Sequence, residues 1–262
     1  MPKPFIDLRS DTVTKPSTEM LEAMFKAEVG DDVFHEDPTV IALQEKIAKL
    51  FSMEASLFFP SGTMANQVAI KIQTNPGDQV ICDKDAHIFH YESGGVAFNS
   101  GVSCCLINGN NGQFTSEDVK NNINKPEFYH TPFSKLVAIE NTANRAGGTF
   151  WNFTELKAIK AVCNANNLKF HLDGARLWNA LVETDELPAD YGNLFDTISV
   201  CLSKGLGCPG GSLLISSSEN INRALRYRKV FGGNMRQIGY YAAAGIYSLD
   251  HNRLRLKNDH LK

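Results

Sequence analysis

The segment SVCLSKGLGCPGGS, residues Ser199 to Ser212, joins two apolar runs through a loop that is rich in glycine. Lys204 stands at the end of the first run, and four glycines follow it within residues 205–211. A backbone without side chains can pass close to a ligand or to another chain. A desolvated lysine amine loses proton affinity and can act as a nucleophile toward an aldehyde. The segment therefore predicts a strand end that holds a reactive lysine.

Outward from this segment, short β-rich runs alternate with helical ones along the chain. The expected strands are 55–60, 79–83, 103–108, 135–141, 169–173, 196–203 and 211–216. The expected helices are 38–51, with Asp37 as N-cap, 63–73, 115–123 and 152–167. Several strands are apolar almost throughout, as are parallel strands that are covered on both faces. This order predicts an α/β layer fold with a mostly parallel sheet, in which ligands gather beyond the carboxyl ends of the strands.

The composition narrows the class of protein. The chain has 262 residues, 43% of them hydrophobic, and a net charge of −3, which fits one large globular domain with or without a smaller part. It lacks a dense Lys/Arg stripe and a long apolar run, so we expect no nucleic-acid partner, no membrane span and a cytoplasmic location. The six cysteines lack CxxC spacing, so we expect reduced thiols and no metal site. The absence of a G-x-G-x-x-G pattern argues against a dinucleotide site.

An anion site is expected after the first strand. Ser61, Gly62 and Thr63 open a helix there, and the free backbone N–H groups and dipole of a helix N-terminus favour a phosphate. The alternative is a capped helix after a tight turn.

Two further strand ends carry charged or titratable side chains. The segment KDAHIFHYE includes His87, which by itself could be a surface or packing residue. Asp173 ends the strand 169–173, where a buried carboxylate needs a positive partner. That partner could be Arg176, in a salt bridge, or the protonated ring nitrogen of a ligand. An anion cradle, a carboxylate and a lysine are together what a pyridoxal phosphate site needs.

The order of motifs resembles the low-specificity L-threonine aldolases, within the β-eliminating lyase group of pyridoxal phosphate enzymes. The motifs are DLRSDTVTKPS (7–17), GDDVFHEDPTV (30–40), FFPSGTMANQVA (58–69), DAHIFHYESGG (85–95), IENTANRAGG (139–148), HLDGARLWNA (171–180) and CLSKGLGCPGGS (201–212). The resemblance spans nearly the whole chain. It implies the large domain of a fold-type-I pyridoxal phosphate transferase.

The resemblance also implies a role for each matching residue. Ser61, Gly62 and Thr63 would hold the cofactor phosphate, and His87 would stack on the cofactor ring. Asp173 would bind the pyridine nitrogen, and Lys204 would form the Schiff base. Ser10 and Arg176 would lie near the substrate carboxylate or a cofactor oxygen, an arrangement that suits the bidentate guanidinium. Without the resemblance, Ser10 is a hydroxyl in an N-terminal turn.

The implied reaction is the aldol cleavage of L-threonine or L-allo-threonine to glycine and an aldehyde. A β-eliminating lyase for another amino acid, or a catalytically impaired cofactor-binding fragment, are the alternatives, because cofactor-binding residues do not select the bond that breaks. We expect a homodimer or homotetramer, with Ser10 and Arg236 near the subunit boundary.

The expected domains are an N-terminal segment with helices (1–50), a pyridoxal phosphate-binding domain (51–245) and the start of a truncated C-terminal small domain (246–262). Three features depart from the family pattern. Ala143 replaces a histidine that is usual near the substrate hydroxyl, and His35 stands where glycine is common. The family's C-terminal segment, which supplies another carboxylate-binding arginine, is expected to be missing.

Overall fold

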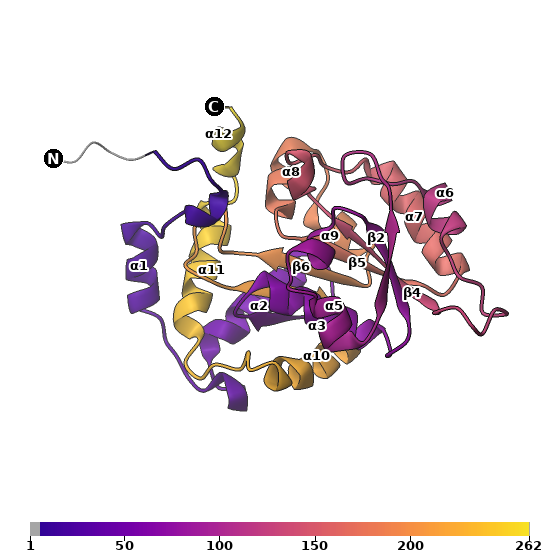
Figure 1. The fold of residues 1–262 in the computed structure, drawn as a ribbon. Helices are drawn as coiled ribbons and strands as arrows, with labels where there is room; N and C mark the ends of the chain where they lie inside the picture. The colour runs from indigo at the N-terminus through magenta and orange to yellow at the C-terminus, as the bar shows by residue number, and fades with distance from the viewer. Residues whose placement is uncertain (1–5, 262) are drawn as a thin grey trace.

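A seven-stranded sheet forms the centre of the protein, which a computed structural model describes over residues 6–261 (Figure 1). The strand order is β1-β7-β6-β5-β4-β2-β3. Only β7 runs against its neighbours β6 and β1, so the other six strands end at the same edge. The strands are β1 Ala55–Phe59, β2 Gln79–Asp83, β3 Ser103–Ile107, β4 Ser134–Glu140, β5 Lys169–Gly174, β6 Thr197–Cys201 and β7 Ser212–Ser216. The seven predicted strands and the mostly parallel sheet are confirmed.

Helices cover both faces of the sheet. One face packs against α3, α4, α5 and α10, and the other against α2, α6, α7, α8, α9 and α11. Adjacent strand residues serve opposite faces: Leu57 and Phe59 pack against α3 and α10, whereas Phe58 packs in the other layer. This double coverage explains why the strands are apolar almost throughout.

The helices include the four predicted ones and others that were not predicted, two of which are 13 residues long. They are α1 Thr18–Phe25, α2 Pro38–Leu50, α3 Gly62–Gln73, α4 His87–His90, α5 Gly95–Ser100, α6 Ser116–Asn121, α7 Phe153–Ala165, α8 Leu177–Glu183, α9 Pro188–Gly192, α10 Ser218–Val230, α11 Gly239–His251 and α12 Leu256–His260, with the 3₁₀ helices η1 Asp11–Val13, η2 Asp32–Phe34 and η3 Asn144–Ala146. Over residues 6–261, no helix is long and apolar enough to cross a membrane.

The two ends of the chain pack side by side. Helix α11 contacts both α1 and α2, and Figure 1 shows it between them. Its buried face is made of small residues, chiefly Ala242, Ala244 and Gly245. The predicted domain boundary between residues 245 and 246 falls inside this helix, and the division into three parts stays a prediction.

The glycine-rich loop after Lys204 is shaped by neighbours within the chain. Gly211 has a φ of +104°, and a Cβ atom there would lie 2.7 Å from the ring of Phe58 in β1. A side chain at this position would therefore be strained by both its backbone and its neighbour. His35 has a φ of 59°, in the left-handed region that glycine adopts most easily, which accounts for glycine in the family pattern.

Asp37 ties two helices that are distant in sequence. Its Oδ1 accepts hydrogen bonds from the backbone N–H groups of Thr39 and Val40, both at 3.1 Å, which confirms the predicted cap of α2. Its Oδ2 accepts one from the N–H of Gly239, the first residue of α11, at 2.9 Å. The side chain is buried, so these donors depend on it.

The variant Asp37→Ala should lower the free energy of unfolding by about 2–4 kcal/mol, since it removes a cap and leaves a buried N–H unpaired. The matched control is Ser217→Ala, which removes the cap of α10 alone and should lower it by about 1 kcal/mol. Urea unfolding measures both. Equal losses in the two variants would contradict the double role of Asp37.

Candidate active site

Three polar side chains are brought level by the register of the sheet. Glu140 ends β4 and pairs with Asp173 of β5, which in turn pairs with Ser199 of β6. Lys204 follows β6 at the same edge. The site therefore lies at the carboxyl edge of the sheet, as ligand sites of α/β proteins do.

Asp173 is a buried carboxylate, and only 3% of its surface is exposed. Its Oδ2 accepts a hydrogen bond from Asn66 Nδ2 at 2.8 Å, and its Oδ1 accepts one from the N–H of Ala175 at 3.1 Å. Within residues 6–261, Asp173 forms no ion pair with a lysine or an arginine. The alternative of a salt bridge to Arg176 is wrong, because that guanidinium binds Asp11 instead.

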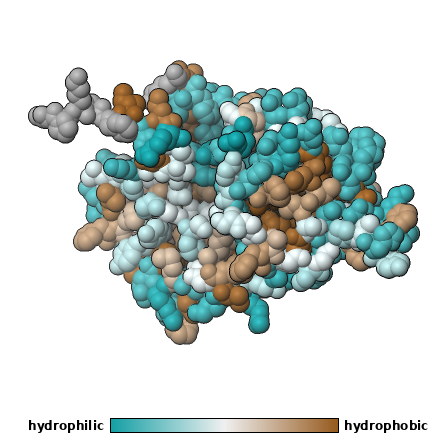
Figure 2. Space-filling view, viewed as in Figure 1, coloured by the Kyte–Doolittle hydropathy of each residue, from teal (hydrophilic) through white to brown (hydrophobic). Residues whose placement is uncertain are grey.

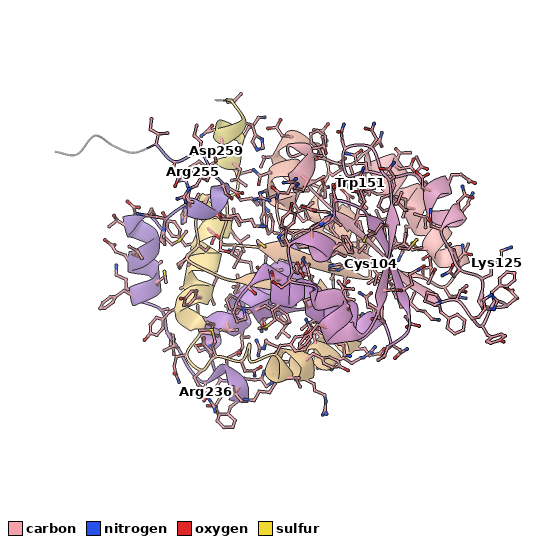
Figure 3. All side chains as sticks on the ribbon, in the orientation of Figure 1. Cys104, Lys125, Trp151, Arg236, Arg255 and Asp259 are labelled. Carbon is pink, nitrogen blue, oxygen red and sulfur yellow. The ribbon has the colours of Figure 1, made fainter. Side chains whose placement is uncertain are left out.

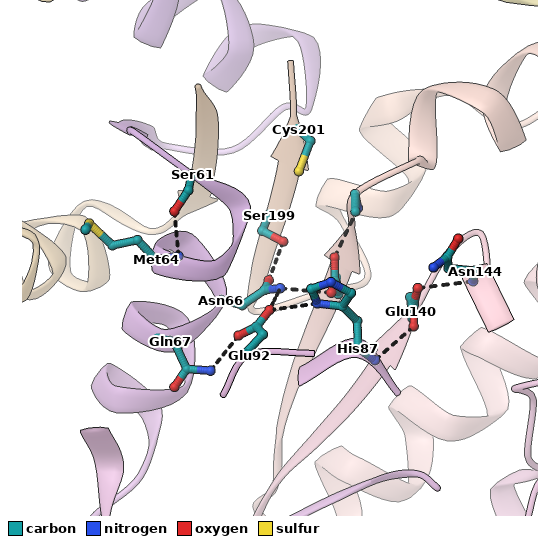
Figure 4. A network of polar contacts seen from close by, with 12 residues as sticks. Ser61, Met64, Asn66, Gln67, His87, Glu92, Glu140, Asn144, Ser199 and Cys201 are labelled. Atoms are coloured by element: carbon teal, nitrogen blue, oxygen red, sulfur yellow. Dashed lines mark hydrogen bonds and ion pairs between the residues drawn. The ribbon is translucent and has the colours of Figure 1, made fainter. Parts of the chain in front are cut away.

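Asn66 of α3 connects several polar side chains of the site, and Figure 4 shows it near Ser199, Glu92 and His87. Its amide nitrogen also donates to Glu92 Oε1 at 2.9 Å, and its Oδ1 accepts a hydrogen bond from Ser199 Oγ at 2.6 Å. His171 Nε2 lies 3.2 Å from the same Oδ1. Burial lowers the pKa of His171 to about 4, so the imidazole is neutral and donates from Nε2.

His87 is the first residue of α4 and lies beside Asp173. Its Nδ1 is 3.1 Å from Glu92 Oε1, while Glu92 Oε2 accepts a hydrogen bond from Gln67 Nε2 at 2.5 Å. A nitrogen of His87 and oxygens of Glu92 and Asp173 lie within 4.8 Å of one another. The hydrogen bond to Glu92, together with the nearby negative charges, raises the pKa of His87 despite its partial burial.

Glu140 is a site residue that the sequence analysis did not identify. It is 8% exposed, and its two carboxylate oxygens accept hydrogen bonds from the N–H groups of His87 and Asn144, both at 3.1 Å. Burial, followed by the charge of Asp173, raises the pKa of Glu140 to about 7. It also lines a cavity of about 180 Å³ with Lys84 and Ala143.

The predicted phosphate cradle is the N-terminus of α3. Ser61 caps this helix, because its side chain accepts a hydrogen bond from the N–H of Met64 at 3.2 Å. The structure therefore contains the capped helix that was the alternative to an anion site, and the cap does not exclude an anion. Gly62 has no room for a side chain, since a Cβ atom there would lie 2.7 Å from Cys201 Sγ. Thr63 is exposed, and the first N–H groups of a helix have no partner within it. The cradle is open to an anion.

The cationic residues are held by the N-terminal segment. Arg176 donates from Nε to Asp11 Oδ2 at 2.9 Å and from its NH2 group to Asp11 Oδ1 at 2.7 Å. Ser10 precedes Asp11, and its hydroxyl caps η1 through the N–H of Thr12. The carbonyl of Lys204 accepts a hydrogen bond from Thr14 Oγ1 at 2.7 Å. Among the described residues, the half-buried Lys204 offers its amine to no hydrogen bond or ion pair.

These residues fit pyridoxal phosphate. An open helix N-terminus suits the phosphate, an uncommitted amine suits the aldehyde, and a buried carboxylate without a lysine or arginine partner suits a protonated ring nitrogen. The fold and the site together define a pyridoxal phosphate enzyme of the α/β class.

The comparisons with known proteins agree with this class. Residues 7–262 match the family described as beta-eliminating lyase. The chain is 44% identical to the low specificity L-threonine aldolase of Escherichia coli K12 over 256 residues, which cover 97% of this chain and 76% of that protein. It is 39% identical to low-specificity L-threonine aldolase 1 of Arabidopsis thaliana, over 98% of this chain and 73% of that one.

A solved structure supports the fold. The threonine aldolase of Leishmania major superposes with a TM-score of 0.81 over 94% of this chain and 73% of that chain, at 24% identity. This chain belongs to the beta-eliminating lyase family, and its cofactor is pyridoxal phosphate.

Glu140 predicts a change of stability with pH. Its pKa rises from an ordinary 4.5 to about 7 in the fold, so its contribution to stability is present below pH 4.5 and is lost as the pH rises toward 7. The variant Glu140→Gln should remove this loss, which is on the order of 3 kcal/mol. Urea unfolding of cofactor-free protein between pH 4.5 and 7.5 measures it.

Glu117→Gln is the matched control, because this glutamate lies on the surface of α6. It should follow the wild-type profile. Parallel profiles for wild type and Glu140→Gln would show that Glu140 does not titrate in this range.

Proposed function

We propose that this protein is a pyridoxal phosphate-dependent carbon–carbon lyase that cleaves L-threonine and L-allo-threonine to glycine and acetaldehyde. The observation that carries the proposal is the buried Asp173 carboxylate, which lies at the same sheet edge as the uncommitted amine of Lys204. Relatives about 40% identical over nearly the whole chain are threonine aldolases by name. When bound, the cofactor accepts the electrons that are released as the bond between Cα and Cβ breaks.

Four residues or segments are proposed to hold the cofactor. Lys204 would bind its aldehyde carbon, and Asp173 would keep its ring nitrogen protonated. His87 would lie against the ring, because it stands beside Asp173 and is anchored by Glu92. The N–H groups of the segment 61–63 would bind the phosphate, supported by the dipole of α3.

The substrate carboxylate is proposed to bind at Arg176 and Ser10. Arg176 is among the residues that line a cleft of about 340 Å³, and 18% of its side chain is exposed. Ser10 is held close to it through the neighbouring Asp11. The buried methyl group of Ala143 cannot exchange a proton with the substrate hydroxyl, so another group has to take that proton.

The assembly is proposed to be a homodimer or homotetramer, since closed symmetry is the usual solution. Large apolar side chains are exposed, among them Phe25 and Phe98 at 87% and 90%, and Figure 2 shows apolar surface within the face that it presents. Arg236, which is expected near the subunit boundary, pairs with Asp31 and lies at the opposite end of the molecule from Asp259 of α12 (Figure 3).

A cytoplasmic location of the protein also stays a prediction.

The activity test is incubation of the protein with L-threonine and with L-allo-threonine, followed by measurement of glycine and acetaldehyde. Lys204→Ala should lower the rate by at least about a thousandfold, because the covalent anchor and its amine are lost. Lys49→Ala, which removes an exposed lysine from the last turn of α2, should keep the wild-type rate. A wild-type protein that binds cofactor and yields no glycine would refute the proposed reaction.

Light scattering after size-exclusion chromatography tests the assembly. We expect two or four copies, with the exposed apolar side chains covered in part by the neighbouring copy. An active species with the mass of one chain would contradict the proposal.

A further inference from the structure

One contact of the N-terminal segment is made with a residue that lies 165 positions further along the chain. Asp11 and Arg176 form two parallel hydrogen bonds, at 2.9 and 2.7 Å, and both side chains are largely shielded from solvent. A bidentate pair of this kind fixes the plane of the guanidinium as well as its position. An exposed ion pair would add little to the stability of the protein. This pair includes Arg176, the residue that is proposed to bind the substrate carboxylate.

Within residues 6–261 the Arg176 guanidinium donates to Asp11 alone, and this pair leaves a second fork of donors. Arginine has five N–H groups, and Asp11 takes only one from Nε and one from the NH2 group. The remaining N–H of that group and one N–H of the NH1 group point along the end of the guanidinium. They form a second pair of parallel donors, which matches the two oxygens of another carboxylate.

The same segment also touches the backbone of Lys204. Thr14 Oγ1 donates to the Lys204 carbonyl at 2.7 Å, three residues after Asp11. Burial alone would raise the pKa of Asp11, but the hydrogen bonds and charge of Arg176, with the charge of Lys204, lower it below its ordinary value. Asp11 is therefore ionised at neutral pH and lies in the field of both cations.

We propose that Asp11 is a positioning residue that holds the Nε side of Arg176, so that the end-on fork of the guanidinium faces the carboxylate of the amino-acid substrate. This rests on the proposed function. Substrate affinity should then depend on Asp11 through the carboxylate alone. Neither the amine of the substrate nor the attachment of the cofactor should depend on it.

The test is a titration of the cofactor-loaded protein with two amines, followed by the absorbance of the cofactor. Glycine carries a carboxylate, whereas 2-aminoethanol carries a hydroxyl group in its place. In Asp11→Asn the amide keeps the shape, accepts one hydrogen bond and turns an N–H donor against the guanidinium. The Kd for glycine should rise at least about tenfold, and the Kd for 2-aminoethanol should stay within about twofold of wild type.

Two further variants separate positioning from structural damage. Asp7→Asn breaks the pair with Arg9 in the same segment and should leave both Kd values unchanged. Asp11→Glu keeps the charge and should restore part of the glycine affinity. In turnover, Asp11→Asn should raise KM for L-threonine about tenfold, with kcat within about twofold of wild type.

Three results for Asp11→Asn would overturn the inference and leave the proposed function standing: unchanged glycine affinity, equal loss of affinity for both amines, or tighter binding of glycine. The last would mean that Asp11 competes with the substrate carboxylate for Arg176. If the spectrum of the wild-type protein responds to neither amine, the proposed function fails, and the inference fails with it.

Discussion

The buried carboxylate of Asp173 is the constraint on which the rest of the site depends. A carboxyl group with 3% exposure is costly to bury unless hydrogen-bond donors or positive charges surround it. The protein supplies the amide of Asn66 and the N–H of Ala175. Asn66 is fixed in turn by Ser199 and by the neutral His171. The remaining need of Asp173 for a cation is what a protonated ring nitrogen would satisfy.

This charge also sets the state of its neighbours. Burial raises the pKa of Glu140, which stands opposite in the sheet register, and the charge of Asp173 raises it further; the same charge adds to the effect of Glu92 on the pKa of His87. The N-terminal segment binds both cationic residues of the site, Arg176 through the carboxylate of Asp11 and Lys204 through its backbone carbonyl. The site thus combines buried carboxylates with two cationic residues that the N-terminal segment binds.

Local pattern predicted much of the fold and part of the site. The strands, four of the helices (α2, α3, α6 and α7) and the Asp37 cap follow from apolar periodicity and cap chemistry, which are local in sequence. Helices α4, α8 and α9 were missed, since four to seven residues carry little pattern and tertiary packing holds them; the 13-residue helices α10 and α11 were not predicted either. The rule of strand ends would have found Glu140. No local signal joins Asp11 to Arg176, or Asn66 to Asp173, since only the folded sheet brings these pairs together.

The most direct test of the account is the protonation state of the ring nitrogen, measured by ¹⁵N NMR on protein loaded with cofactor labelled at that atom. The account predicts a protonated nitrogen in the wild-type protein from pH 6 to 9, and an unprotonated one in Asp173→Asn. An unprotonated nitrogen in the wild type, or the same chemical shift in both proteins, would show that the buried carboxylate serves the fold and not the cofactor.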